Sequence, residues 1–218
     1  MDWIAFGISL KLAALTTIIL LPLSILLARW LVWSRHGLKH FVEILVTLPL
    51  VLPLTVIGFF LLMAFSRQSV FGEMFETLFG SSLAFSFSGL LLASLLVNIP
   101  FAVQPMQRGF ETITPETRES ALCCGLTPWK TFLKIELPLA RNGVIGAALL
   151  TFAHTLGEFG VVLMVGGNIS GETRTLSIAI FDQVEAFNES AATTMSLMLL
   201  AVSVLIIASL FYLGRRSR

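Results

Sequence analysis

The chain has 218 residues, of which 56% are hydrophobic and only 12% charged, and its mean hydropathy is +0.90. Soluble domains carry about 25% charged residues, so this composition excludes a soluble globular protein and makes a lipid bilayer the solvent for most of the chain. The net charge of +1 and the lack of a basic patch give no indication of nucleic-acid binding. The two cysteines, Cys123 and Cys124, are sequence neighbours, so we assign neither a disulfide nor a metal site.

Five apolar runs are long enough to cross a bilayer, because a hydrocarbon core of about 30 Å requires roughly 20 helical residues. In chain order they cover approximately residues 8–33, 44–65, 90–106, 144–165 and 194–213. The first run is longer than the core of a signal peptide and has no basic leader, so we interpret it as a retained span. The sequence predicts an all-α integral membrane protein in which residues 1–218 form one transmembrane domain.

The basic residues predict the orientation of these spans. Of the 14 Lys and Arg residues, three flank the first loop, five mark the long central loop and three end the chain. The remaining three, Lys11, Arg67 and Arg174, fall on the other side. The positive-inside rule then places the N-terminus outside and the C-terminus in the cytoplasm, which an odd number of spans satisfies.

The second and third spans contain prolines and isolated polar residues. Pro49 and Pro53 cannot donate helical hydrogen bonds, so they predict a kink in the second span. The kink is either a packing bend or a hinge beside a transport pathway. Asn98 and Gln104, in the third span, either line such a pathway or satisfy backbone carbonyls that nearby prolines leave without partners.

The central loop, residues 111–140, carries two helix starts. Thr114-Pro115-Glu116 supplies a hydroxyl cap, a proline at the first helical position and an acid near the positive end of the dipole. Gly125 is a left-handed stop, and Thr127-Pro128-Trp129 repeats the start. The pattern predicts two short helices joined by a tight glycine turn on the cytoplasmic side.

The fourth span contains the one ionisable pair inside an apolar run, His154 and Glu158. Because they are four residues apart on one helix, we expect their side chains to meet. The pair is a structural brace, part of an outer gate or a proton-coupling site; a carboxylate would repel an anionic substrate. Thr151 and Thr155 in the same span are further candidates for lining a pathway.

After this span, residues 175–187 place apolar side chains at helical spacing, which predicts a surface helix on the outer side.

The central loop resembles the EAA loop of ABC importer permeases, which reads Glu-Ala-Ala, three residues, Gly, nine residues, Ile-x-Leu-Pro. The matching residues begin at Glu119-Ser120-Ala121, with Ser120 departing from the usual Ala, and continue at Gly125 and Ile135-x-Leu137-Pro138. The resemblance implies that this loop couples the spans to a separate ATPase. Its expected coupling residues are Glu119, Ser120, Ala121, Leu122, Gly125, Ile135, Leu137 and Pro138.

Three further segments are similar to the permeases for molybdate, tungstate and sulfate, and the length and span count look most like the molybdate subunit. They are the proline-rich second span, Leu156-Gly157-Glu158-Phe159-Gly160, and residues 174–180. The resemblance implies a MetI-like fold in the bacterial inner membrane and import of molybdate by alternating access. It also implies a homodimer, two ATPase subunits and an external oxyanion-binding protein. Pro49, Pro53, Asn98, Thr151, Thr155, His154, Gly157 and Glu158 are then candidates for the pathway or its gate.

Other functions remain open at this point. Sulfate, thiosulfate or tungstate would suit the same class of permease. A secondary transporter or channel predicts inverted repeats and several intramembrane charges, and an intramembrane enzyme needs a nucleophile with a base or a metal cluster. The chain has no phosphate-binding G-x-x-x-x-G-K-[ST] motif, so we expect it to bind no cofactor and expect ATP and Mg²⁺ to be held by a partner.

Overall fold

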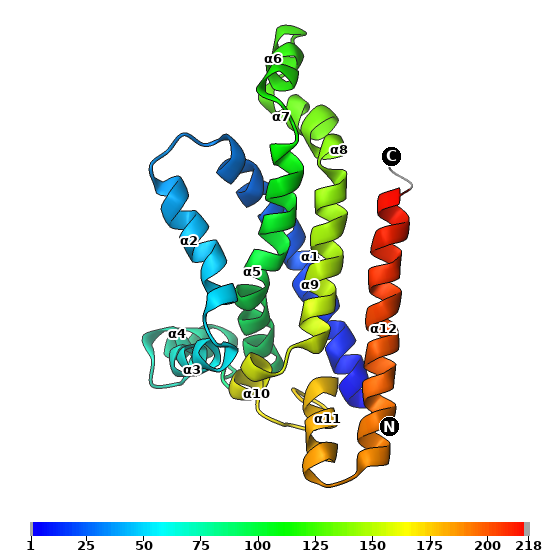
Figure 1. The fold of residues 1–218 in the computed structure, drawn as a ribbon. Helices are drawn as coiled ribbons and strands as arrows, with labels where there is room; N and C mark the ends of the chain where they lie inside the picture. Colours follow the sequence, from blue (N-terminus) through cyan, green and yellow to red (C-terminus); the bar gives the residue numbers. More distant parts are fainter. Residues whose placement is uncertain (1, 216–218) are drawn as a thin grey trace.

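A computed structural model describes residues 2–215, which are mostly helical (Figure 1). Three of its helices are long and apolar enough to cross a membrane: α1 (Trp3–Trp33), α5 (Phe87–Glu111) and α12 (Glu189–Arg215). Two bent helix pairs raise the number of candidate spans within the described residues to five if each pair counts as one crossing. The predicted five spans correspond to this upper value.

Helices α1 and α5 begin at side-chain caps and extend beyond the predicted apolar runs. The backbone N–H of Ala5 donates to Asp2 Oδ1 at 2.9 Å, and that of Gly89 donates to Ser86 Oγ at 3.2 Å. These caps satisfy amide groups that the first helical turn leaves without partners. Polar residues continue α5 past its apolar run, so this helix ends at Glu111, five residues beyond the run predicted to end at residue 106.

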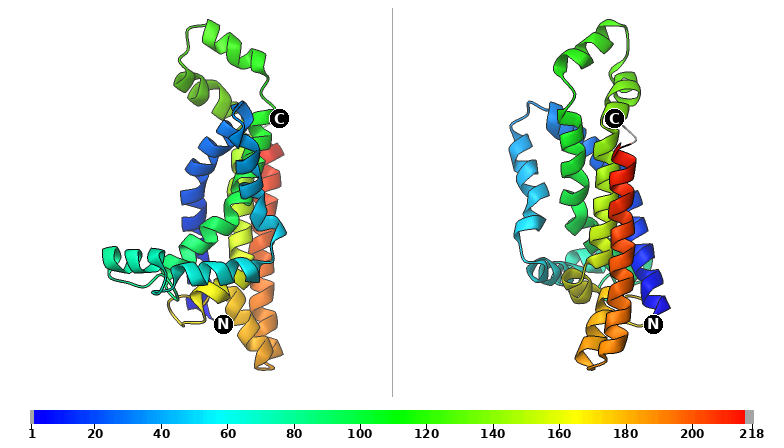
Figure 2. Two further views of the ribbon diagram at one scale, coloured as in Figure 1. Left: turned by 90° about the vertical axis from the view of Figure 1, so that its left-hand side faces the viewer. Right: turned by 45° about the vertical axis from the view of Figure 1, so that its right-hand side comes forward.

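Two helices occupy the predicted span over residues 44–65. Helix α2 (Leu38–Val51) and helix α3 (Leu54–Phe65) meet at an angle of 111°. Pro53 has no N–H for the helical ladder and forces Leu52 into an extended conformation, with ψ of 140°. The predicted kink is therefore a sharp break. Beyond it, α3 and the following α4 (Val70–Phe79) lie across the end of the bundle (Figure 2).

The predicted continuous span over residues 144–165 is also broken. Helix α9 (Arg141–Gly157) ends before Glu158, which is extended with ψ of 133°, and α10 (Gly160–Gly166) follows. Glycines on both sides of the break lower the helix propensity there. Gly58 of α3 allows α10 to approach, since a Cβ on Gly58 would lie 2.8 Å from Met164 Cβ. The outer part of this span thus turns aside to pack on α3.

The centre of the molecule is formed by α1, α5 and α9. Their core side chains include Leu31, Val103, Met106 and Phe110, all without exposed surface. Near the end of the bundle that bears the central loop, α5 and α9 cross in backbone contact, because a Cβ on Gly143 would lie 2.6 Å from the carbonyl oxygen of Pro105. This crossing holds together the two helices from which the loop departs.

The two ends of the bundle differ (Figure 1). The loop helix α6 (Pro115–Cys123) projects beyond one end, and α12 finishes on that side. The start of α1, α10, the α3–α4 pair and α11 (Leu176–Glu185) lie at the opposite end. The helix predicted over residues 175–187 is confirmed as α11. The described chain therefore starts and finishes at opposite ends, as an odd number of crossings requires.

Candidate functional site

The first half of the central loop is helix α6, as the caps predicted. The hydroxyl of Thr114 accepts a hydrogen bond from the N–H of Thr117 at 3.4 Å. At the other end Gly125 has a φ of +81°, a left-handed conformation that favours glycine. The N–H of Gly125 donates to the carbonyl of Leu122 at 2.9 Å and that of Leu126 donates to the carbonyl of Ala121 at 3.2 Å. These two hydrogen bonds form a Schellman motif, which holds the turn after α6 in one conformation.

The second half of the loop is a helical segment with three parts. Helix α7 (Pro128–Thr131) starts at the cap of Thr127, continues as the π-helical turn η1 (Phe132–Glu136) and then as α8 (Leu137–Leu139). This segment meets α9 at 68°. The sequence predicted the helix and its start but not the π-helical turn. The wider turn rotates the residues that follow it relative to a regular helix.

A buried ion-pair network connects the loop to the end of α1. Glu136 has no exposed surface and binds two arginines: Arg29 Nε lies 2.5 Å from Oε2, and Arg118 Nε lies 2.7 Å from Oε1. Aromatic rings cover both guanidinium groups, since Arg118 lies 4.1 Å from the centre of the Trp33 ring and Arg29 lies 5.1 Å from that of Phe132. Because the three charged side chains are paired and the guanidinium groups are covered, the network holds the loop and the end of α1 in one relative position.

Sequence reasoning missed this network. A signal was available: an acid, Glu136, stands between Ile135 and Leu137, two of the expected coupling residues. Its partners could not be read from the sequence, because Arg29 is 107 positions away.

The structure divides the eight expected coupling residues between surface and interior. Glu119, Ser120, Leu122, Gly125 and Pro138 are exposed, Ile135 and Leu137 are half-buried, and Ala121 is buried. Ala121 therefore lies inside the loop. The surface of the loop also presents apolar side chains, with Leu122 44%, Trp129 62% and Leu133 44% exposed.

A second polar cluster lies between α5 and the break after α9. Asn98 is fully buried, and its Oδ1 lies 3.0 Å from His154 Nδ1 while its Nδ2 donates to Glu158 Oε2 at 3.5 Å. Ser94 Oγ donates to the same carboxylate oxygen at 3.3 Å. The ring of His154 stacks on Phe101 with centroids 3.8 Å apart. This cluster fastens α9 and its break to α5.

The predicted direct contact between His154 and Glu158 is wrong. The helix ends at Gly157, so Glu158 leaves the helical register and turns toward α5, and Asn98 stands between the two side chains. Ser94 and Asn98, four residues apart on α5, were the signal for this bridge. The other carboxylate oxygen of Glu158 has no hydrogen-bond partner within the described part of the chain.

The remaining pathway candidates do not form one site. Thr151 and Thr155 are buried in α9, where the Thr155 hydroxyl donates to the carbonyl of Thr151 at 2.8 Å and so satisfies backbone, as the alternative interpretation proposed. Gly157 is exposed at the end of that helix. Pro49 and Pro53 belong to α2 and the break that follows it.

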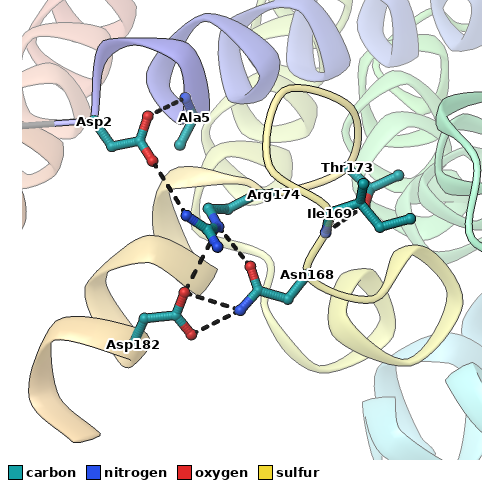
Figure 3. A network of polar contacts seen from close by, with 7 residues as sticks. All are labelled: Asp2, Ala5, Asn168, Ile169, Thr173, Arg174 and Asp182. Carbon is teal, nitrogen blue, oxygen red and sulfur yellow. Dashed lines mark hydrogen bonds and ion pairs between the residues drawn. The ribbon is translucent and has the colours of Figure 1, made fainter. Parts of the chain in front are cut away.

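At the opposite end of the bundle, Arg174 joins three segments (Figure 3). Its Nε donates to Asn168 Oδ1 at 2.6 Å, and its guanidinium lies 3.8 Å from Asp2 and 3.7 Å from Asp182. Asn168 in turn donates to Asp182 at 2.8 Å. The network ties the start of α1 to α11 through the loop that follows α10.

Residues 5–218 match the family described as the binding-protein-dependent transport system inner membrane component. The chain belongs to this family. Binding-protein-dependent permeases of this kind work with ATPase subunits and a periplasmic binding protein, and the match confirms the predicted recognition as a permease with several apolar helices in a membrane.

Relatives of known name place this permease near the molybdate branch. It is 43% identical over 210 residues to the molybdenum transport system permease protein ModB of Azotobacter vinelandii, covering 96% of this chain and 93% of that one. It is 33% identical over 218 residues to ModB of Escherichia coli K12, covering 100% and 95%. The probable sulfate transport system permease protein cysT of Zygnema circumcarinatum is 33% identical over 215 residues, covering 98% of this chain and 74% of that one.

Among solved structures, this permease is similar to a bacterial alginate ABC transporter crystallised with an alginate pentasaccharide-bound periplasmic protein. The TM-score is 0.78 at 19% identity, over 98% of this chain and 78% of the other. The likeness confirms the predicted fold class, an all-α permease with the MetI-like fold.

Proposed function

We propose that this chain is the membrane-spanning subunit of an ATP-driven importer for molybdate in the bacterial inner membrane. The observation that carries the proposal is the rigid helical loop at one end of the bundle, which bears the EAA-type residues and presents Glu119 and Leu122 on its surface. A capped, glycine-turned pair of helices with exposed apolar side chains is a docking element rather than a simple connection.

Two contacts support the transmission of force from this loop to the spans. The Arg118–Glu136–Arg29 network links α6, the π-helical turn and the end of α1. The crossing at Gly109 and Gly143 links α5 and α9, the two helices that carry the loop. When the ATPase subunits close on ATP, they would move the loop as a unit, and the spans would open alternately to each side.

The proposed assembly contains two copies of this chain, two ATPase subunits that hold ATP and Mg²⁺, and an external protein that delivers the oxyanion. Five spans with the N-terminus outside would place α11 and the Arg174 network on the side of that protein. Substrate affinity would then reside mainly in the delivery protein, and the permease would need only a weakly binding path.

Substitutions in the loop test the coupling. The double variant Glu119→Lys, Gly125→Asp should insert in the membrane but lose copurification of the ATPase subunit and ATP-driven uptake. Glu189→Lys, at the start of α12 on the opposite end, is the control for assembly and should keep copurification of the ATPase subunit. Full uptake by the loop double variant would reject the coupling role.

The cargo is tested by uptake into vesicles that contain the reconstituted complex and its delivery protein. We expect ATP-dependent uptake of molybdate that persists in an excess of sulfate. The 33% identity to the cysT relative favours sulfate as the second candidate cargo. Uptake of sulfate in preference to molybdate would reject our assignment within the same class of transporter.

A further inference from the structure

Helix α4 has two chemically distinct faces. When its sequence is wound at about 100° per residue, apolar and polar side chains fall on separate halves of the helix. One half carries Glu73, Glu76 and Thr77, together with a glycine, and the other half carries only apolar side chains. With 10 residues, α4 rises about 15 Å and is too short to cross a bilayer. A short helix with this pattern suits the boundary between water and an apolar phase.

Contacts with the turn after α3 fix which side of α4 is covered. A Cβ on Gly72 would lie 2.1 Å from the carbonyl oxygen of Ser66, so the start of α4 is in backbone contact with this turn. The ring of Phe75 packs against the apolar cluster that contains Phe65. These contacts leave one row of large apolar side chains uncovered: Val70, Met74 and Leu78, which are 85%, 51% and 69% exposed.

This uncovered row continues the apolar surface of α3. Helix α4 extends sideways from the end of the bundle opposite the coupling loop (Figure 2). Helix α3 contains no charged residue and exposes Phe60 and Met63, so its exposed surface suits acyl chains. Only residues 66–69 separate the two helices. A bilayer that surrounds α3 therefore also meets the row on α4.

The charges of α4 indicate which kind of lipid it meets. Helices that bind anionic membranes carry Lys or Arg on their polar face, whereas α4 contains two acids and no basic residue. Glu76 is paired with Arg67 at 3.1 Å, and Glu73 adds a further negative charge to the same face. Anionic headgroups repel such a face, and the ammonium groups of zwitterionic phospholipids attract it.

We propose that α4 is a lipid-binding anchor that inserts the row Val70, Met74 and Leu78 among zwitterionic phospholipids at the end of the bundle opposite the coupling loop. Insertion would hold the apolar face of α4 about 5–10 Å into the boundary between headgroups and acyl chains. It would also hold α3 at the membrane surface, and with it α10, which packs against Gly58 of α3. The inference goes beyond the proposed function and does not depend on the cargo.

Spin labels measure which face of α4 meets lipid. Cys123 and Cys124 are exposed, so both are first replaced by serine. Leu78→Cys and Thr77→Cys, at adjacent exposed residues, then carry a nitroxide in the full chain, reconstituted in liposomes of phosphatidylcholine and phosphatidylethanolamine. Oxygen is enriched in the acyl region, and a nickel chelate stays in water.

We expect the ratio of oxygen to nickel collision rates to be several-fold higher at residue 78 than at residue 77, because the two residues lie on opposite faces. Met74→Cys and Glu73→Cys should repeat this difference one turn earlier on the helix.

Charge substitutions on the two faces test the insertion itself. Met74→Asp places a charge among the acyl chains, so the collision ratio of a label at residue 78 should fall to that of a label at residue 77. Thr77→Asp, on the polar face, is the matched control and should leave the ratio at residue 78 unchanged. Replacing part of the lipid by phosphatidylglycerol should not raise this ratio, because α4 has no basic residue.

Three outcomes would overturn the inference. Equal ratios at residues 77 and 78 would show that α4 has no side that faces lipid. Slow collisions with both oxygen and the nickel chelate at residues 74 and 78 would show that a protein surface, such as a second copy of the chain, covers the row. A ratio that rises with phosphatidylglycerol would show attachment to anionic lipid. The proposed function fails separately, through the absence of ATP-driven molybdate uptake.

Discussion

Arg118 and Glu136 form an ion pair of 2.7 Å in which the carboxylate has no exposed surface and binds Arg29 on its other oxygen. The pair joins the first helix of the coupling loop to its second, and through Arg29 to α1. We expect a loop held in this way to move as one body, and a loop without the pair to bend at its own turn.

Replacement of Glu136 by Ala should destabilise the protein and reduce coupling. Removing one partner from a buried network leaves two guanidinium groups unpaired, and the loss is about 2–3 kcal/mol because both arginines remain about a quarter exposed. Thermal unfolding in detergent and ATP-driven uptake would show the effect. Lys130→Ala, which removes an exposed charge in the same loop, should change stability by less than about 0.5 kcal/mol. Equal stability of the two variants would contradict the role of the network.

Gly125 should tolerate Asn much better than Val. Its φ of +81° is open to Asn at a small free-energy penalty, while a β-branched side chain is strongly disfavoured there. A Cβ added at this residue would meet no other atom within 4 Å, so the difference comes from the backbone and not from a clash. We expect Gly125→Asn to retain copurification of the ATPase subunit and Gly125→Val to reduce it several-fold. Loss of copurification with both variants would show that the partner contacts the glycine itself.

Gly143→Ala should separate α5 from α9, because the added Cβ would lie 2.6 Å from the Pro105 carbonyl oxygen. The matched control is Gly146→Ala, on the same helix, where the nearest atom would be Pro105 Cβ at 3.9 Å. Overpacking of this kind destabilises by about 1–3 kcal/mol. The thermal unfolding midpoint should therefore fall for Gly143→Ala and stay near the original for Gly146→Ala. A stable Gly143→Ala with full uptake would show that the helices can move apart freely.

Asn98→Leu should destabilise the bundle, because it removes the bridge between His154 and Glu158 and leaves a buried carboxylate with Ser94 alone. Loss of partners for buried polar groups amounts to about 1–3 kcal/mol. The double variant Asn98→Leu, Glu158→Leu should recover part of the stability, since the unsatisfied acid is removed as well. If thermal unfolding shows no recovery, the bridge is not the reason for the loss.

The sequence predicted those parts of the molecule that local chemistry determines. The two loop helices followed from Thr-Pro starts and a glycine stop, and the structure places them at Pro115–Cys123 and from Pro128 onward. Helix α11 followed from its apolar spacing. Helix caps and apolar periodicity depend on residues that are close in sequence, so the local sequence is enough to predict these helices.

Long-range contacts set the features that the sequence did not predict. The prolines predicted a kink at Pro53 but not its sharpness, and nothing in the sequence predicted the break at Glu158, where α10 turns to pack on α3. The partners of Glu136 and Glu158 lie on α1 and α5, far away in the chain. The prediction of a direct contact between His154 and Glu158 was wrong because it assumed a regular helix through the break.

The two breaks also shorten the hydrophobic dimension of the molecule. Helices α2 and α9 contain 14 and 17 residues, so they rise about 21 and 26 Å, less than the roughly 30 Å thickness of a hydrocarbon layer. Around these helices the bilayer must thin, or flanking polar side chains must extend to the interface. Where the membrane thins, the hydrocarbon layer beside α2 and α9 is thinner than in the surrounding bilayer. Transport rates should then depend on the acyl-chain length of the host lipid.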